Sequence, residues 1–279
     1  MPLVLKRVEP ARGATWLRDA FRLFVRRPLP FTMLFIVFMA TALAISLLPF
    51  IGGLLQMMMP PLLSLGFMIA SQSALLGERI HPSQFIEPLR GDPARRRSLL
   101  LLCLIYGLSA VGILLLCQAI AGPAGAQLQD LMARGQPSQT EVVALLSDGA
   151  LQTTLLVGLA LGALLTVPFW HAPALVHWGG QGVGQALFSS TLAVWRSKGA
   201  FLVYGMTWVG LCLGFAVLVE LLYALLGSGE LGSLLVLPLG LMLSTVFYVS
   251  LLFTFNDSFG SAEAGAGSAT EAGSRASTS

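Results

Sequence analysis

Six long apolar runs dominate the sequence and constrain its fold more than any other feature. They cover about residues 30–51, 54–76, 98–121, 151–176, 200–227 and 231–255. As helices, these runs are long enough to cross the hydrocarbon core of a bilayer, which takes about 20 residues. Only 10% of the residues are charged and 56% are hydrophobic, so the chain could not cover a soluble globule with polar groups. The sequence therefore predicts an all-α, polytopic membrane protein with six transmembrane helices.

The links between the apolar runs predict how the helices pair. Only Gly52-Gly53 separates the first two runs, and only Gly227–Glu230 separates the last two. Links this short join antiparallel neighbours. We therefore expect three helical hairpins, each made of consecutive runs. The longer link at 122–150 contains two stretches, 127–134 and 140–146, that are expected to form short amphipathic helices.

The basic residues predict the orientation in the membrane. Of the 16 Lys and Arg residues, all but Arg134 lie in segments that six spans place on one side of the membrane. Short loops rich in Lys and Arg stay in the cytoplasm. We therefore expect both termini in the cytoplasm and the loop 122–150 outside. The predicted parts are a cytoplasmic amphipathic segment at 1–29, a six-helix transmembrane domain at 30–257 and a disordered, Gly- and Ser-rich cytoplasmic tail at 258–279.

An amphipathic segment precedes the first apolar run. In GATWLRDAFRLFVRRP, the apolar side chains follow the spacing of one helical face: Leu17, Ala20, Phe21, Phe24 and Val25. Arg18, Arg22 and Arg26 stack on the opposite face, and Trp16 lies near the start of the segment. A helix of this kind lies in the headgroup plane. We expect it to anchor the chain on membrane lipids, and a role as a regulatory lipid sensor is the alternative.

The same pattern recurs before the fifth apolar run. In GQALFSSTLAVWRSKGAF, Trp195 aligns with Phe24 of the first segment, and Trp195 and Arg196 are expected at the membrane surface. A shorter version broken by prolines, HPSQFIEPLRGDPARRR, precedes the third run. These similarities suggest three degenerate parallel units, each made of an interfacial segment and a hairpin.

These segments resemble a family of uncharacterised proteobacterial integral inner-membrane proteins with six spans. The resemblance covers about residues 13–257 and is most specific within 168–205, in FWHAPALVHW and GVGQALFSSTLAVWRSKGAFLVYG. GATWLRDAFRLFVRRP and PFIGGLLQMMMPPLLSLGFMIA also contribute to it. The resemblance implies a location in the bacterial inner membrane and the same architecture. It implies no activity, cofactor or catalytic residue.

The stretch TVPFWHAPALVHW, at the end of the fourth run, is a candidate site. Pro168 and Pro173 each remove a backbone donor, so the helix is expected to bend there. One hypothesis is structural: the side chain of His171, between the two prolines, bonds a carbonyl that they leave free. The alternative is a ligand or proton role, because ionisable residues inside a membrane are functional candidates.

Glu220, near the outer end of the fifth run, is the second ionisable candidate. Its carboxylate either reaches the outer membrane surface or forms a cation or proton site with another span. The pairs Gly158/Gly162 and Gly210/Gly214 have the GxxxG spacing that lets helices pack closely. Packing between spans or formation of a homo-oligomer explains both pairs.

Signatures of catalysis and of cofactor binding are scarce. Cys103, Cys117 and Cys212 all lie in apolar runs without metal-binding spacing, and no nucleotide-binding or zinc-protease motif occurs. The basic residues flank apolar runs instead of forming a continuous patch for nucleic acid. We therefore expect no catalytic residue, metal site, cofactor or nucleic-acid partner.

The leading functional hypothesis is a non-catalytic membrane protein that binds lipids or a membrane-protein partner. The alternative is a small transporter or channel-like protein for an apolar or weakly polar solute, with a cavity near Pro60-Pro61, His171 and Pro238. A membrane enzyme is the third hypothesis. A transporter of a charged solute would need more charged residues in its spans than His171 and Glu220 supply.

Overall fold

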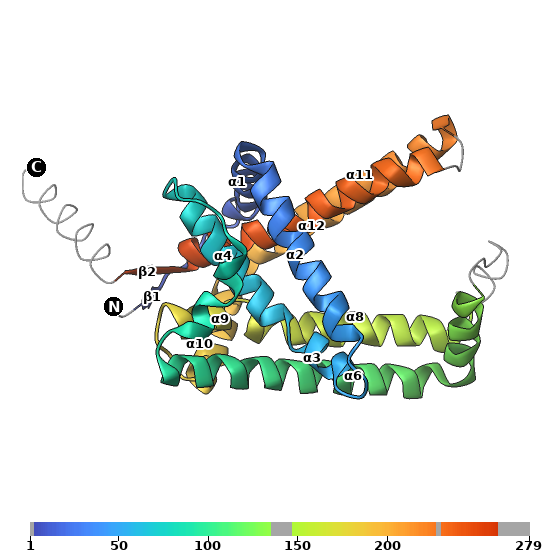
Figure 1. The fold of residues 1–279 in the computed structure, drawn as a ribbon, viewed down its shortest axis with the longest axis horizontal. Coiled ribbons are helices and arrows are strands. Elements are labelled where there is room, and N and C mark those ends of the chain that lie inside the picture. Colours follow the sequence, from blue (N-terminus) through green and yellow to red (C-terminus); the bar gives the residue numbers. More distant parts are fainter. Residues whose placement is uncertain (1–2, 135–146, 227–229, 262–279) are drawn as a thin grey trace, which may run out of the picture.

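The computed structural model describes residues 3–134, 147–226 and 230–261 (Figure 1). Its elements, in chain order, are β1 (Leu3–Leu5), α1 (Arg12–Arg26), α2 (Pro28–Ser46), α3 (Gly52–Met57), α4 (Pro60–Leu75), the 3-10 helix η1 (Pro82–Phe85), α5 (Glu87–Arg90), α6 (Pro93–Ala133), α8 (Gly149–Phe169), α9 (Ala172–His177), α10 (Val183–Arg196), α11 (Lys198–Leu226), α12 (Glu230–Ser258) and β2 (Phe259–Ser261). Apart from two strands of three residues each, the described elements are helical. The all-α prediction is confirmed.

Five helical stretches in the described part of the chain are long and apolar enough to cross a membrane. They are Pro28–Ser46, Pro93–Ala133, Gly149–His177, Lys198–Leu225 and Val236–Ser258. These stretches correspond to the first, third, fourth, fifth and sixth predicted spans. In each, most backbone groups form hydrogen bonds within the helix, as a bilayer requires.

The second predicted span, about 54–76, is divided into α3 and α4. Pro60 and Pro61 occupy the first positions of α4, where a missing N–H costs no helical hydrogen bond. The same residues cannot continue α3, because proline removes a donor and clashes with the preceding turn. The resulting α4 has 16 residues, fewer than the roughly 20 that cross a bilayer. Most of them are buried, since α4 packs against α6, α9 and α12.

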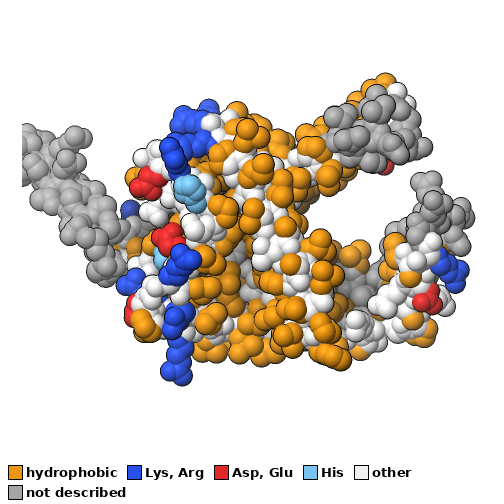
Figure 2. Space-filling model, viewed as in Figure 1, with side chains coloured by type: hydrophobic (Ala, Val, Ile, Leu, Met, Phe, Trp, Pro, Cys, Tyr) orange, Lys and Arg blue, Asp and Glu red, His pale blue; other side chains and the backbone are white. Residues whose placement is uncertain are grey.

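Two pairs of long helices project from this centre as arms. α6 lies beside α8 in one arm, and α11 lies beside α12 in the other (Figure 1). The arms diverge, and the space-filling view shows a hollow between them with apolar side chains along its edges (Figure 2). α11 is the least enclosed of the five long helices, because none of the residues in its most apolar part is buried. The arms therefore present apolar surface of the kind that acyl chains cover.

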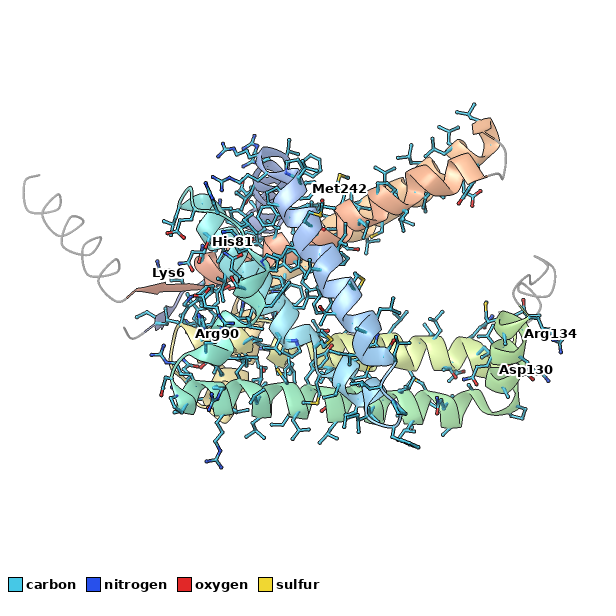
Figure 3. All side chains as sticks on the ribbon, in the orientation of Figure 1. Lys6, His81, Arg90, Asp130, Arg134 and Met242 are labelled. Atoms are coloured by element: carbon cyan, nitrogen blue, oxygen red, sulfur yellow. The ribbon has the colours of Figure 1, made fainter. Side chains whose placement is uncertain are left out.

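The first arm ends in a sharp bend of α6. Gly122 has a φ of 50° and a ψ of −135°, a conformation that glycine adopts without steric cost. The helix then continues to Ala133 across the tip of the arm, where Asp130 and Arg134 lie (Figure 3). The predicted short helix at 127–134 is thus confirmed as far as Ala133. The second short helix predicted there, at 140–146, lies outside the described residues.

Basic side chains gather at the end of the molecule opposite the arm tips. Figure 2 shows Lys and Arg side chains along this end, and Lys6 and Arg90 lie there in Figure 3. We call it the basic end. Figure 3 places Arg134 at the far tip. The charge separation in the sequence is therefore also a separation in space.

The first and last described segments of the chain meet at the basic end. β1 pairs with β2 in antiparallel register, with Val4 opposite Gly260. The structure therefore corrects the predicted boundary of the C-terminal tail, because Phe259–Ser261 form a strand. The sequence contains no strand signal there, since three residues are too few to show an alternating pattern. The rest of the predicted tail, 262–279, lies outside the described residues.

Helix α1 docks on α11 and α12 instead of resting its whole apolar face on lipid. Trp16, Ala20 and Phe24 are buried in the protein, whereas Phe21 and Val25 are exposed. The predicted apolar face is thus divided between protein and surroundings. Its basic face is exposed as predicted, at Arg18, Arg22 and Arg26.

Candidate functional site

The helix of the fourth predicted span breaks at the predicted place. α8 ends at Phe169 and α9 begins at Ala172, with His171 as the residue that precedes the new helix. Pro173 takes the second position of α9, where it needs no helical donor. Pro168 remains within the last turn of α8. The bend expected from these two prolines is confirmed.

A hydroxyl group from α10 completes the hydrogen bonding at this break. The backbone N–H of His171 donates to Ser190 Oγ at 3.0 Å, and the Ser190 hydroxyl donates to the carbonyl oxygen of Val167 at 3.2 Å. Ser190 thus bridges a donor and an acceptor that the prolines separate. The sequence analysis predicted that the His171 side chain bonds a carbonyl that the prolines leave free. This prediction is wrong, because the Ser190 hydroxyl bonds the carbonyl of Val167. The only sequence signal for Ser190 was a small polar residue in an amphipathic segment, which does not identify its partner.

The His171 side chain is fully buried in an aromatic cluster. Its ring contacts Phe201, Phe255 and Phe259 edge to face, with centroids 6.0, 5.8 and 5.4 Å away. Within the described residues, neither ring nitrogen has a hydrogen-bond partner. No group of three or more His, Cys, Asp or Glu residues there could hold a metal ion. The contacts make His171 part of the aromatic packing, and its ligand or proton role stays a prediction.

An apolar pocket lies where the two arms meet, beside the break between α8 and α9. It has a volume of about 170 Å³ and is partly open. We call it the central pocket. Four helices contribute its lining: Pro60, Pro61 and Ser64 of α4, Tyr106 of α6, Thr166 and Phe169 of α8 with the adjoining Trp170, and Phe247, Tyr248 and Leu251 of α12.

Several contacts hold the walls of the central pocket. The Trp170 indole N–H donates to Thr254 Oγ1 at 3.1 Å, which ties the helix break to α12. The rings of Tyr106 and Phe169 lie edge to face, with centroids 5.0 Å apart, and this contact joins α6 to α8. The aromatic walls are therefore positioned by contacts between different helices.

The chemistry of the central pocket suits an apolar ligand. No charged side chain lines it. The hydroxyls of Ser64 and Thr166 already donate to carbonyls of their own helices, Pro61 O and Gly162 O, at 2.9 and 2.8 Å. A buried cavity of about 150 Å³ lined by aliphatic and aromatic groups can hold benzene. The volume of the central pocket, about 170 Å³, is similar.

The structure brings only part of the predicted site together. Pro60 and Pro61 line the central pocket, but the side chain of His171 does not. Pro238 is exposed on α12, and Glu220 is exposed on α11. The cavity predicted near Pro60-Pro61, His171 and Pro238 therefore exists only at the first of these three places. The aromatic walls were missed, because their residues are far apart in sequence.

The residues predicted at the membrane surface also divide into two groups. Trp195 and Arg196 are exposed at the end of α10, as expected. Trp16 is instead fully buried between α1 and its neighbours. The amphipathic pattern does not distinguish a face that packs on protein from one that packs on lipid, since both need apolar side chains.

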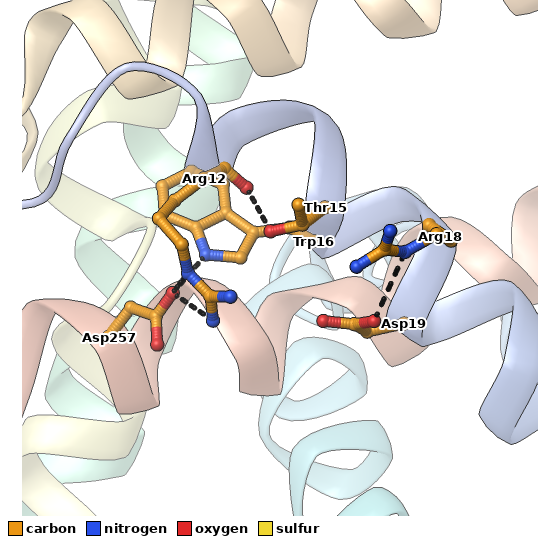
Figure 4. A network of polar contacts seen from close by, with 6 residues as sticks. All are labelled: Arg12, Thr15, Trp16, Arg18, Asp19 and Asp257. Atoms are coloured by element: carbon orange, nitrogen blue, oxygen red, sulfur yellow. Dashed lines mark hydrogen bonds and ion pairs between the residues drawn. The ribbon is translucent and has the colours of Figure 1, made fainter.

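Asp257 fixes the position of Trp16 and of α1 (Figure 4). Its Oδ2 atom accepts hydrogen bonds from Trp16 Nε1 at 2.7 Å and from Arg12 Nε at 2.8 Å. Arg12 Nη2 lies 2.7 Å from the same oxygen. A carboxylate that binds a guanidinium and a buried indole makes a strong, charge-assisted contact. It joins α1 to the C-terminal end of α12.

The fold and the pocket can be compared with known proteins. A "probable inner membrane protein" of Burkholderia thailandensis is 31% identical to this chain over 260 residues, which cover 93% of this chain and 95% of that protein. The chain belongs to that family of inner-membrane proteins. No protein-family profile matches the chain, and no solved structure matches it.

Membership of this family confirms the resemblance seen in the sequence. The similarity extends over nearly the full length of both proteins. Together with the five long apolar helices, it identifies a multi-pass integral membrane protein of the bacterial inner membrane. The name of the family member describes a location and no reaction.

Proposed function

We propose that the protein is a non-catalytic inner-membrane protein that binds the acyl chain of a lipid in the central pocket. The observation that carries this proposal is the lining of that pocket, which is aromatic and aliphatic apart from Ser64 and Thr166 and has no charged side chain. An acyl chain needs apolar contact and no specific hydrogen bond. The pocket lies where four helices meet, so a bound chain would contact both arms.

The arrangement of the arms supports entry from the membrane. They diverge from the base where the pocket lies, and apolar side chains line the hollow between them (Figure 2). A lipid chain in the bilayer can therefore approach without crossing a polar surface. A transporter for an apolar solute is the alternative, and it would use the same pocket.

We also propose that the chain crosses the membrane six times, as three hairpins. The pairing of β1 with β2 supports this number, because two paired strands are expected on the same side of a membrane. An even number of crossings between them agrees with that expectation. Five helices are long enough to cross alone, and α3 and α4 together supply 52–75 for one more crossing. We propose that the basic end faces the cytoplasm, as its Lys and Arg residues favour.

A photo-crosslinking experiment tests acyl-chain binding. A phospholipid with a diazirine in its acyl chain is added to the purified protein in a bilayer nanodisc, and the labelled residues are mapped by mass spectrometry. We expect labelling of Tyr106, Phe247 or Tyr248 in the central pocket. Thr166→Phe should fill the pocket and reduce this labelling about tenfold, the effect of a loss of about 1.4 kcal/mol in binding.

Thr41→Phe is the matched control. Thr41 is exposed on α2, and its hydroxyl donates to the carbonyl of Val37 just as Thr166 donates to that of Gly162. This variant should leave labelling of the pocket unchanged. Labelling of exposed Leu213 on α11 reports contact with bulk lipid in every sample. If Leu213 is labelled and the pocket is not, acyl-chain binding in the pocket is excluded.

A further inference from the structure

A second pocket lies at the basic end, between the segment that precedes α1 and the corner between α10 and α11. One wall is formed by residues 7–10, and the other by residues 196–199 and Leu202. Its volume is about 870 Å³. We call it the corner pocket. It shares no lining residue with the central pocket, so the two sites can be altered separately.

Buried contacts fix the two walls of the corner pocket. The backbone N–H of Val8 donates to Ser197 Oγ at 3.2 Å, and both residues are buried. A Cβ atom at Gly199 would lie 3.0 Å from Pro10 Cγ, so the two segments pack closely there. The N–H of Lys6 donates to the carbonyl of Ser258 at 2.8 Å, which holds the first wall from behind. The pocket is therefore formed by packed segments.

Three cations converge on the corner pocket from two distant parts of the chain. Arg7 comes from the N-terminal segment, and Arg196 and Lys198 come from the α10–α11 corner. Glu9 is the one acidic residue of the lining. Within the described residues, none of the three cations forms an ion pair. Three cations and one carboxylate leave the lining with a net positive charge, which attracts an anion.

The corner pocket lies where a membrane helix begins. The apolar stretch of α11 starts at Lys198, and Leu202 is 66% exposed one turn further along it. Trp195 is 71% exposed, and Lys198 Nζ lies 5.5 Å from the centroid of its ring. Tryptophan is enriched at the depth of the headgroups. Cationic groups at this depth, directly beside exposed apolar surface, match a molecule with an anionic head and an apolar body.

We propose that the corner pocket binds the phosphate group of an anionic phospholipid, with the lipid's acyl chains along the exposed face of α11. Basic pockets between membrane helices bind such headgroups. This site is independent of acyl-chain binding in the central pocket, because the two linings are separate. It gives the basic end a specific lipid ligand in addition to its general attraction to an anionic surface.

Lipid titration of the purified full-length protein tests the site. Phosphatidylglycerol is added in detergent, and bound lipid is counted by native mass spectrometry. The double variant Arg196→Gln/Lys198→Gln should bind about 30-fold more weakly, since each basic residue near an anionic lipid contributes about fivefold. The control is Arg18→Gln/Arg22→Gln, which removes two exposed cations of α1 and should change the affinity less than twofold. Both double variants should keep the unfolding temperature of the natural protein, because all four side chains are exposed.

Two further variants separate a built site from diffuse charge. Arg196→Lys/Lys198→Arg keeps both charges and should retain affinity within about threefold. Glu9→Gln removes the acidic residue of the lining and should raise the affinity for phosphatidylglycerol about fivefold. An equal loss of affinity in both charge-removing double variants would show diffuse surface attraction and overturn the proposal. Unchanged affinity in the Arg196→Gln/Lys198→Gln variant would overturn it too.

Two ligand controls distinguish the source of the phosphate. Phosphatidylcholine, which carries a phosphate but no net charge, should bind at least tenfold more weakly than phosphatidylglycerol. Inorganic phosphate at millimolar concentration should not displace the lipid, because it lacks the apolar body. Displacement by inorganic phosphate at that concentration would assign the pocket to a soluble anion and overturn the lipid assignment. Thr166→Phe, which fills the central pocket, should leave phosphatidylglycerol affinity unchanged, so each proposal can fail separately.

Discussion

Ser190 is the residue on which the break between α8 and α9 depends. It accepts from the N–H of His171 and donates to the carbonyl of Val167, so one hydroxyl serves two backbone groups. In an apolar environment, a backbone group without a partner costs several kcal/mol. Because Ser190 belongs to α10, the same bonds tie that helix to the break. The positions of Trp170 and Phe169 in the central pocket follow from where this break occurs.

Replacement of Ser190 tests its role. Ser190→Ala should lower the free energy of unfolding in detergent by about 1–3 kcal/mol, since the buried N–H of His171 loses its partner and the carbonyl of Val167 loses one of two donors. Thr191→Ala is the control on the neighbouring residue. Thr191 is exposed and its hydroxyl donates to its own helix, at Leu187 O, so the change should be within about 0.5 kcal/mol. Equal stability of the two variants would contradict the bridging role.

At the scale of elements, α1 depends on the last helix for its position. Asp257 binds both Arg12 and the buried indole of Trp16. Asp257→Ala should therefore leave the Trp16 N–H unpaired and lower the free energy of unfolding by about 1–3 kcal/mol. It should also speed tryptic cleavage after Arg18 and Arg22, which denaturing gel electrophoresis would follow over time.

The control for this change is Asp19→Ala. Asp19 forms an ion pair with Arg18, which is exposed, and Asp19 Oδ1 lies 3.6 Å from Arg18 Nε. Such a pair contributes about 0–1 kcal/mol, so loss of Asp19 should alter stability and cleavage little. If the Asp257 variant keeps the cleavage rate of the natural protein, α1 is held mainly by apolar packing.

The helices could be predicted better than the contacts between them. The six long apolar runs predict six membrane helices, because a bilayer allows few other structures, and five of the six runs form such a helix in the described part of the chain. The division of the second run follows from Pro60-Pro61, a signal that was available in the sequence. The hydrogen bond between Trp16 and Asp257 could not be predicted, because an amphipathic pattern identifies the apolar face of a helix and not the residues that cover it. The pocket was predicted only at its prolines, since Tyr106, Phe247 and Tyr248 approach one another through tertiary packing.

At the scale of the whole molecule, the basic end and the strand pair predict the topology. Reporter domains fused after Gly135 and after Ser279 should report opposite sides of the membrane, with the second in the cytoplasm. A fusion at the N-terminus should report the same side as the fusion after Ser279, because β1 pairs with β2. Termini on different sides would be incompatible with that pairing and with six crossings.

The pairing of β1 with β2 also sets an order of events during synthesis. Strand β1 is made first, but its partner at 259–261 is made after all the long helices. Chains grow at roughly 5–20 residues per second, so β1 waits on the order of ten seconds or more. Trp16 waits as long for Asp257. A nascent chain therefore completes its basic end only after translation has passed residue 261. A chain that stops before residue 257 lacks both β2, the partner of β1, and Asp257, the partner of Trp16.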